Sequence, residues 1–235
     1  MNRKHAFSLI EVLIVIAVLA VLLALLIPTI SSARQSSLNA RSFNNLRQIG
    51  TALAVFTSEN GGFIMPRAYA SAATTPKGQS RYWTATLYNN RYLDDKRAFY
   101  DPRFPPYGPD EDASGQRIES GTPATYGMRD WVKPGETIGS TTTRVAKRIT
   151  VIKVPSDFFI VADSYWMAWG TQGYGISPGE QGDNRVRLDK TGMAGALFLD
   201  GHVERKPKAY FEGLGQTQGE YSDNQPFPTW SPARD

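Results

Sequence analysis

A single carboxylate lies near the start of a long apolar run, where it can form a charge pair but would have little contact with water. Phe7-Ser8-Leu9-Ile10-Glu11 leads into a stretch that stays apolar from Val12 to Ile27. Inside a bilayer an acidic side chain is unfavourable by about 2.5 to 3.5 kcal/mol or more. We therefore expect Glu11 to pair with a charged group, which makes it the first candidate functional residue.

The segment ahead of this run is short and basic. Met1-Asn2-Arg3-Lys4-His5-Ala6 ends in a small residue, as a cleavable leader does. The run from Phe7 to Ile27 is long enough to cross the roughly 30 Å hydrocarbon core as a helix rising about 1.5 Å per residue. Because basic residues flanking a span stay on the cytoplasmic side, we expect a single-pass protein with a cytoplasmic N-terminus and an exported body.

The junction from Ala6 to Leu13 resembles the class III leader junction of type IV pilins and type II secretion pseudopilins. The resemblance implies that prepilin peptidase cuts between Ala6 and Phe7 and methylates the new amine. It implies an assembly role for Glu11, fifth in the mature chain, and a helix kink at Pro28. Ala6 stands where the family usually has Gly. The expected function is a structural subunit that self-assembles into a helical filament on a platform in the bacterial inner membrane, with its globular domain in the periplasm or outside.

Two other interpretations of this segment remain open. A secretory signal peptide cut near Ser31-Ser32-Ala33 fits the basic start, but it does not explain Glu11 inside the apolar core. A plain membrane anchor leaves Glu11 unexplained as well. The prepilin-type junction accounts for all of these residues, so it is the interpretation that we favour.

The elements beyond Pro28 predict an α+β fold with a helical spine. Leu46, Ile49, Leu53 and Phe56 follow helical spacing, and Asn60-Gly61-Gly62 supplies a helix stop. We expect one helix over 7–58, with 7–27 as the membrane segment, packed against a C-terminal antiparallel sheet. The remaining boundaries that we expect are a leader at 1–6, a globular domain at 59–215 and an extended or disordered tail at 216–235.

The C-terminal third carries the strand signals. Residues 149–154 and 158–162 are rich in β-branched and aromatic residues, and Asp200-Gly201 separates two further runs with the signature of a two-residue hairpin turn. A pattern of His, nine residues and Asp-Gly is associated with pilin-like proteins that have large globular domains. Here Lys190 replaces that His, so the resemblance is partial, and an unliganded hairpin turn is the simpler interpretation.

Two groups of carboxylates are compatible with calcium, although we expect no cofactor. Asp110, Asp112 and Ser114 have the alternate spacing of the first half of an EF-hand loop, but Gly121 stands where its bidentate Glu belongs. Asp163, Asp183, Asp189 and Asp200 are a second candidate group, of which Asp163 and Asp200 are the main candidates. A zinc site is not expected, because the chain has no Cys and its two His residues include His5 in the leader.

Composition argues against catalysis and nucleic-acid binding. After loss of the leader, His202 is the remaining imidazole, and no nucleophile elbow accompanies the combination of His202, Ser164 and Asp163. The formal charge is +4, and no block of like charges forms a basic patch. We therefore expect neither an enzyme nor a nucleic-acid partner. The aromatic run containing Trp166 and Trp169 supports an alternative function, a membrane-anchored module that binds a carbohydrate or a protein.

Overall fold

The computed structural model divides the chain into two compact units, residues 1–40 and 41–235. The residues it describes are 9–68, 79–104, 106, 118, 125–129, 147–166, 170–176 and 184–211. The leader and the predicted tail at 216–235 lie outside these ranges.

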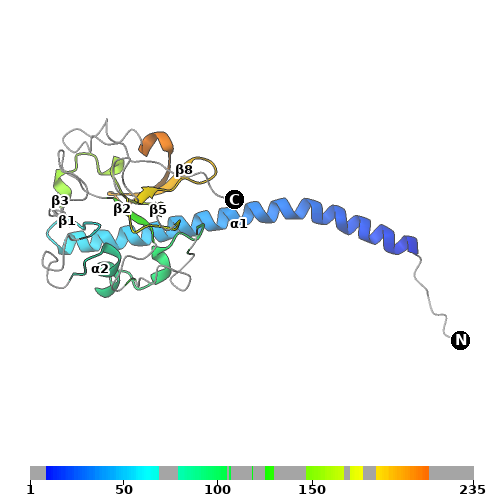
Figure 1. The fold of residues 1–235 in the computed structure, drawn as a ribbon, viewed down its shortest axis with the longest axis horizontal. Helices are drawn as coiled ribbons and strands as arrows, with labels where there is room; N and C mark the ends of the chain where they lie inside the picture. Colours follow the sequence, from blue (N-terminus) through cyan, green and yellow to red (C-terminus); the bar gives the residue numbers. More distant parts are fainter. Residues whose placement is uncertain are drawn as a thin grey trace. The chain divides into compact units, whose positions relative to one another are not determined.

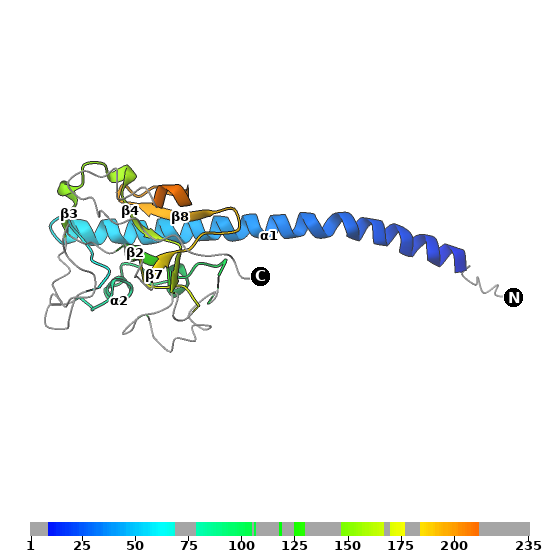
Figure 2. The ribbon, with the colours of Figure 1, turned by 45° about the horizontal axis from the view of Figure 1, so that its top comes forward.

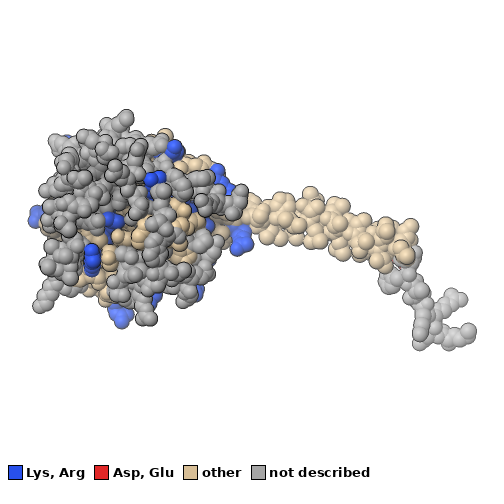
Figure 3. All heavy atoms as spheres, viewed as in Figure 1, with Lys and Arg blue, Asp and Glu red and all other residues tan. Residues whose placement is uncertain are grey.

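The first unit contains the apolar part of helix α1 (Leu9–Glu59). The large apolar side chains from Leu9 to Ile30 are all at least half exposed, and α1 is the one helix among the described residues that is long and apolar enough to cross a membrane. Figure 3 shows the apolar part of α1 as a continuous tan surface on the face in view. An aqueous environment would not favour so much exposed apolar surface, so this unit needs lipid or other helices around it.

The helix continues through Pro28. Proline has no N–H to donate to the preceding turn, which weakens the helix at this position. Two hydroxyls bond to nearby carbonyls: Thr29 Oγ1 donates to Leu26 O at 2.7 Å and Ser31 Oγ to Pro28 O at 2.9 Å. Such local bonds compete with backbone bonds and accompany helix bending, so the predicted kink at Pro28 remains a prediction with local support.

The second unit places the rest of α1 against a sheet, which confirms the predicted α+β class. In Figures 1 and 2, β8 and α2 lie on opposite sides of this half of α1. The helix ends at Glu59, and Gly61 (φ 64°) and Gly62 (φ 79°) follow in the left-handed conformation. The Gly62 N–H donates to Thr57 O at 2.9 Å, a bond that closes the helix as the Asn-Gly-Gly sequence predicts.

The main sheet has five strands in the order β6-β2-β4-β8-β9. Its pairs are antiparallel except β2 and β6, which run parallel. The sequence predicts an antiparallel sheet, and the structure has a mixed sheet with one parallel pair. Two small two-stranded sheets, β1-β3 and β5-β7, accompany it. The strands are β1 (Phe63–Ile64), β2 (Gly127–Arg129), β3 (Lys147–Arg148), β4 (Phe159–Ala162), β5 (Ser164–Trp166), β6 (Gly175–Ile176), β7 (Asn184–Val186), β8 (Met193–Phe198) and β9 (Val203–Pro207).

The core lies between α1 and the sheet. The four stripe residues of α1 are at most 4 % exposed and share one cluster with Val161 of β4 and Leu197 of β8. Gly50 allows the close approach, because a Cβ added there would lie 2.8 Å from Leu197 Cδ1. The short helix α2 (Trp83–Asn89) adds Trp83 and Leu87 to the same cluster.

Two predicted strand features differ from the structure. Residues 149–151 form a 3₁₀ turn and not a strand, because Pro155 begins another 3₁₀ turn four residues later and limits extended pairing to Lys147–Arg148. The β8–β9 hairpin is correct, but its connection is longer than two residues. The Gly201 N–H donates to Phe198 O and the Phe198 N–H to His202 O, both at 2.9 Å, so Leu199-Asp200-Gly201 makes a three-residue loop with Gly201 at φ 91°.

Candidate functional site

The predicted assembly residue Glu11 lies in the first turn of α1 with its side chain exposed. A carboxylate at this end of a helix is favoured by the helix dipole, typically by about 0.3–1 kcal/mol. That term is smaller than the penalty for an acidic side chain in hydrocarbon. The helix dipole alone therefore does not account for an acidic residue at this position. The predicted cleavage residues, Ala6 and Phe7, lie outside the described part of the chain.

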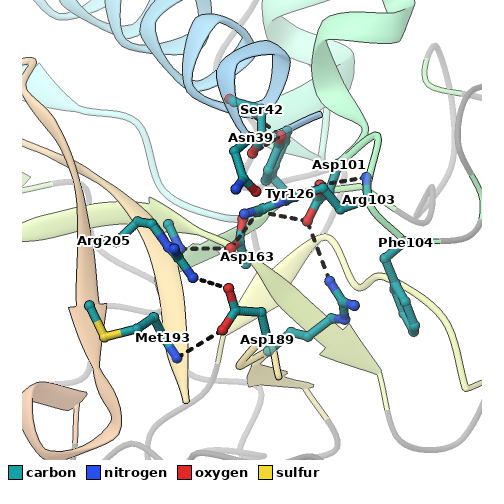
Figure 4. Close-up of polar contacts among 12 residues, drawn as sticks. Asn39, Ser42, Asp101, Arg103, Phe104, Tyr126, Asp163, Asp189, Met193 and Arg205 are labelled. Atoms are coloured by element: carbon teal, nitrogen blue, oxygen red, sulfur yellow. Dashed lines mark hydrogen bonds and ion pairs between the residues drawn. The ribbon is translucent and has the colours of Figure 1, made fainter. Parts of the chain in front are cut away.

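A buried cluster of charged residues lies in the second unit, centred on Asp163 and Arg103 (Figure 4). Asp163 sits between β4 and β5 and is 2 % exposed. Its Oδ2 lies 2.5 Å from Arg103 Nη2 and accepts a 2.7 Å hydrogen bond from the Gly195 N–H of β8. Its Oδ1 is buried and has no hydrogen-bond partner in the structure. Asp163 is therefore held on one oxygen by a cation and by the sheet.

Arg103 also binds Asp101, two residues before it. Its Nε lies 2.8 Å from Asp101 Oδ1 and its Nη2 2.9 Å from Asp101 Oδ2, a two-point contact that matches the planar guanidinium. Arg187, just after β7, adds a second guanidinium 3.6 Å from Asp101 Oδ2, and this group lies 3.9 Å above the ring of Phe104. The cluster thus contains two carboxylates and two guanidinium groups.

A buried amide fixes the backbone of the Asp101 loop. Gln172 is 1 % exposed, and its Oε1 accepts from the Asp101 N–H at 2.8 Å. Its Nε2 lies within 3.0 Å of three carbonyl oxygens, those of Asp101, Phe104 and Pro106. The loop is therefore held by a side chain far away in the sequence, so the position of Arg103 does not depend on local conformation alone.

The cluster connects to α1 through tyrosines. Ser42 Oγ of α1 lies 2.8 Å from the Tyr126 hydroxyl, and both residues are completely buried. Asn45 Nδ2 donates to Tyr100 O at 3.0 Å, directly before Asp101. The same helix therefore fixes both the start of the Asp101 loop and the strand segment that carries Tyr126.

Burial changes the pKa values of this cluster. Burial raises the pKa of Asp163, and the positive charge of Arg103 opposes that change only in part. Burial alone would lower the pKa of Arg103, but the charges of Asp163 and Asp101 outweigh it and raise that pKa. Burial, with the same two carboxylates, raises the pKa of Tyr126 well above its ordinary value. Arg103 and Tyr126 therefore do not titrate near neutral pH.

The calcium candidates Asp163 and Asp200 are not brought together. Asp163 pairs with Gly195 near the start of β8, whereas Asp200 lies beyond the end of that strand. Asp200 Oδ1 accepts from the His202 N–H at 3.1 Å and contacts His202 Nδ1 at 2.6 Å. Slight burial would raise the pKa of Asp200, but these contacts outweigh it and lower that pKa. Among the described residues no group of three or more His, Cys, Asp or Glu side chains could hold a metal ion. Asp110 and Asp112 lie outside those residues, so calcium there remains a prediction.

Lys190, which stands in place of the expected His, is exposed in the turn before β8. The organising residue of that turn is Asp189. Its Oδ1 accepts from the N–H groups of Thr191 at 2.8 Å and Met193 at 3.2 Å, and its other oxygen pairs with Arg205 of β9. Both ends of the predicted nine-residue pattern are therefore turns that flank β8, each organised by an aspartate.

The Ser-His-Asp combination considered from the sequence is not assembled. Ser164 Oγ donates to backbone carbonyls, that of Thr125 at 2.8 Å and that of Gly173 at 2.5 Å, and it accepts from the Gly173 N–H at 3.0 Å. His202 pairs with Asp200 and stacks on Phe198, with ring centroids 4.2 Å apart. Ser164 therefore has a structural role at the sheet, and His202 belongs to the hairpin loop.

The aromatic candidate Trp166 is half-buried on β5. Its ring lies 6.1 Å from that of Tyr174, which in turn contacts Tyr82 at 5.4 Å and lies under the Arg67 guanidinium at 5.1 Å. Trp169 lies outside the described residues. The described aromatic side chains mainly contact one another, as expected for a packed edge of the domain.

Sequence reasoning missed most of the charged cluster. Asp101-Pro102-Arg103 reads as part of a proline-rich loop, and nothing in the local sequence predicts that this loop is buried. The partners Gln172 and Arg187 are far away in the chain, so only the fold reveals them.

Comparison with known proteins bears on the N-terminal segment. Residues 1–27 match the family model described as the prokaryotic N-terminal methylation motif. This is the prepilin motif of type IV pilins and pseudopilins, so the resemblance of the junction is confirmed. No curated protein and no solved structure matches the chain. The motif, the membrane-length helix and the α+β domain together support a type IV pilin-like protein with a membrane anchor.

Proposed function

We propose that the protein is a structural subunit, a pilin or pseudopilin, of a filament of the type IV pilus or type II secretion kind. Prepilin peptidase cuts it between Ala6 and Phe7, and it is stored in the bacterial inner membrane with its globular domain on the far side. The observation that carries the proposal is the methylation motif at 1–27 continuing into an exposed apolar helix that contains Glu11.

In this proposal Glu11 sets the register of assembly. Cleavage leaves Phe7 with a basic amine, and staggered helices in a bundle bring one subunit's amine to a neighbour's Glu11. In surroundings of low dielectric constant the two charges attract far more strongly than in water, and each offsets the desolvation of the other. Docking in one axial position is then favoured over others.

The test compares Glu11→Ala and Glu11→Gln with wild type, using Val12→Ala as a matched control on the same part of the helix. All four chains should insert and lose residues 1–6, because the carboxylate is not at the cut bond. Filament recovery and crosslinking between subunits should fail for both Glu11 variants and persist for Val12→Ala. Normal incorporation of Glu11→Ala into filaments would refute the pairing.

The second candidate is an anchored binding module that uses the aromatic residues around Trp166 and Trp169. The described rings of Trp166, Tyr174 and Tyr82 pack edge to face, and the Arg67 guanidinium lies over Tyr174. Intact-mass measurement of the membrane-extracted protein separates the two. A filament subunit should lack residues 1–6 and carry one added methyl group. An anchor that retains its first residues, or a chain cut after Ala33, would contradict the filament proposal.

A further inference from the structure

The buried pair of carboxylates in the second unit holds its own cation. We propose that Arg103 is a resident cation that closes a site formed by Asp101 and Asp163 and thereby clamps the loop at 101–104 to β8 and α1. The site would accept a small planar cation if the arginine side chain were removed. This inference is independent of the proposed filament function, because it concerns the second unit alone.

The geometry fits a guanidinium in particular. One edge of Arg103 contacts both oxygens of Asp101 at 2.8 and 2.9 Å, and the same Nη2 reaches Asp163 at 2.5 Å. The Arg103 side chain is 5 % exposed, and those of the two aspartates are 2 % and 3 % exposed. A lysine would supply the charge, but it lacks the planar fork that binds two oxygens of one carboxylate.

The charges show why the cation is needed. Without Arg103, Asp163 would lose its 2.5 Å ion pair and retain the Gly195 N–H on Oδ2 and the weaker influence of the Arg187 charge, while its buried Oδ1 has no hydrogen-bond partner among the described residues. Arg187 lies 3.6 Å from Asp101 Oδ2, farther than the contacts of 2.8 and 2.9 Å that Arg103 makes with the same carboxylate. Removing one partner of a buried ion pair leaves an uncompensated charge, which is the strongly destabilising case.

The clamp acts on three elements at once. Asp163 fixes β8 through Gly195, and a Cβ added to Gly195 would lie 3.3 Å from Asp163 Oδ2 and 3.5 Å from Leu46 Cδ1 of α1. The loop of Asp101 is fixed to α1 through Asn45 and Tyr100. Arg103 joins these two connections, so its loss should loosen the packing of the sheet against α1.

The test uses the full-length protein in detergent micelles and compares wild type, Arg103→Lys and Arg103→Ala by thermal unfolding. From the usual penalty for breaking a buried pair, Arg103→Ala should lower Tm by about 6–20 °C, and Arg103→Lys should lower it less. Guanidinium chloride at concentrations well below the denaturing range should raise the Tm of Arg103→Ala. Urea, which has a similar planar shape and no charge, should not, and neither compound should raise the Tm of wild type.

Equal effects of guanidinium and urea on Arg103→Ala, or a fall in its Tm smaller than the lower bound of about 6 °C, would overturn the proposal. If Arg103→Ala does not fold, the double variant Arg103→Ala with Asp163→Asn decides. It removes the cation together with one carboxylate, so it should recover folded protein. A double variant as defective as the single one would show that the arginine acts through its packing volume and not as a counter-ion.

Discussion

Gly127 of β2 gives the sharpest test of how the sheet is packed beside the charged cluster. A Cβ added at this position would lie 2.6 Å from Ile176 Cγ1, 2.6 Å from Ser164 Cβ and 2.9 Å from the Gly175 carbonyl oxygen. Ser164 cannot turn away easily, because its hydroxyl is bonded to three backbone groups. The carbonyl belongs to β6, so relief of the contact must disturb the parallel β2–β6 pairing.

Gly127→Ala should therefore destabilise the domain. Overpacking a well-packed interior costs about 1–3 kcal/mol and occasionally more, and a backbone neighbour places this case in the upper part of that range. For a domain of this size each kcal/mol corresponds to about 2–4 °C, so we expect Tm to fall by about 4–12 °C. Thermal unfolding of the full-length protein in detergent, followed by circular dichroism, measures the change.

Gly192 is the matched control, because a Cβ there would meet nothing within 4 Å although its φ is 73°. Gly192→Ala should lower the free energy of unfolding only by the cost of placing alanine in the left-handed conformation, about 1–2 kcal/mol. Asparagine tolerates the left-handed conformation, so Gly192→Asn should recover part of that loss, whereas Gly127→Asn should be worse than Gly127→Ala. If Gly127→Ala has the same Tm as wild type, the steric reasoning is refuted.

Two further outcomes concern the carboxylates. Because burial raises the pKa of Asp163, the folded state holds this proton more tightly than the unfolded chain. The resulting stabilisation is present below about pH 4 and lost as pH rises through the raised pKa, so the Tm of wild type should fall relative to that of Asp163→Asn as pH rises above about 4. If the difference in Tm between wild type and Asp163→Asn does not change with pH, the raised pKa of Asp163 is contradicted. EDTA should leave the Tm of wild type unchanged, since the Asp163 and Asp200 carboxylates have protein partners; a fall that Asp110→Ala abolishes would instead place calcium in the 110–112 loop.

The helix and the hairpin could be predicted from sequence because their signals are local. Leu46 and Phe56 recur at helical spacing, Gly61 and Gly62 end the helix, and Asp200-Gly201 marks a turn that antiparallel strands require. The predicted turn was one residue too short, because the residue that pairs with His202 to close the loop is Phe198 and not Leu199. Local chemistry indicates that a turn exists better than it fixes the turn's boundaries.

The charged cluster could not be predicted, because burial of Asp101 and Arg103 depends on residues distant in the chain. Gln172 holds their loop and Arg187 adds the second guanidinium, and neither has a spacing that links it to that loop. Asp163 was selected from the sequence for a different reason, as an oxygen ligand for calcium. The residue type of Asp163 indicated that it would bind a cation, but the identity of that cation, an arginine, is set by the tertiary fold.

Strand β9 has a consequence for how copies of this protein can associate. It is the outer strand of the main sheet as described, and its sequence is Val203-Glu204-Arg205-Lys206-Pro207. Charged side chains and a proline, which cannot donate a backbone hydrogen bond, protect a sheet edge from pairing with the edge of another molecule. In the proposed function, membrane anchoring would confine the copies to two dimensions and raise their local concentration, the condition under which an unprotected edge would aggregate. The sequence of β9 therefore disfavours disordered growth through the sheets and leaves ordered contact between copies to other surfaces, the helices among them.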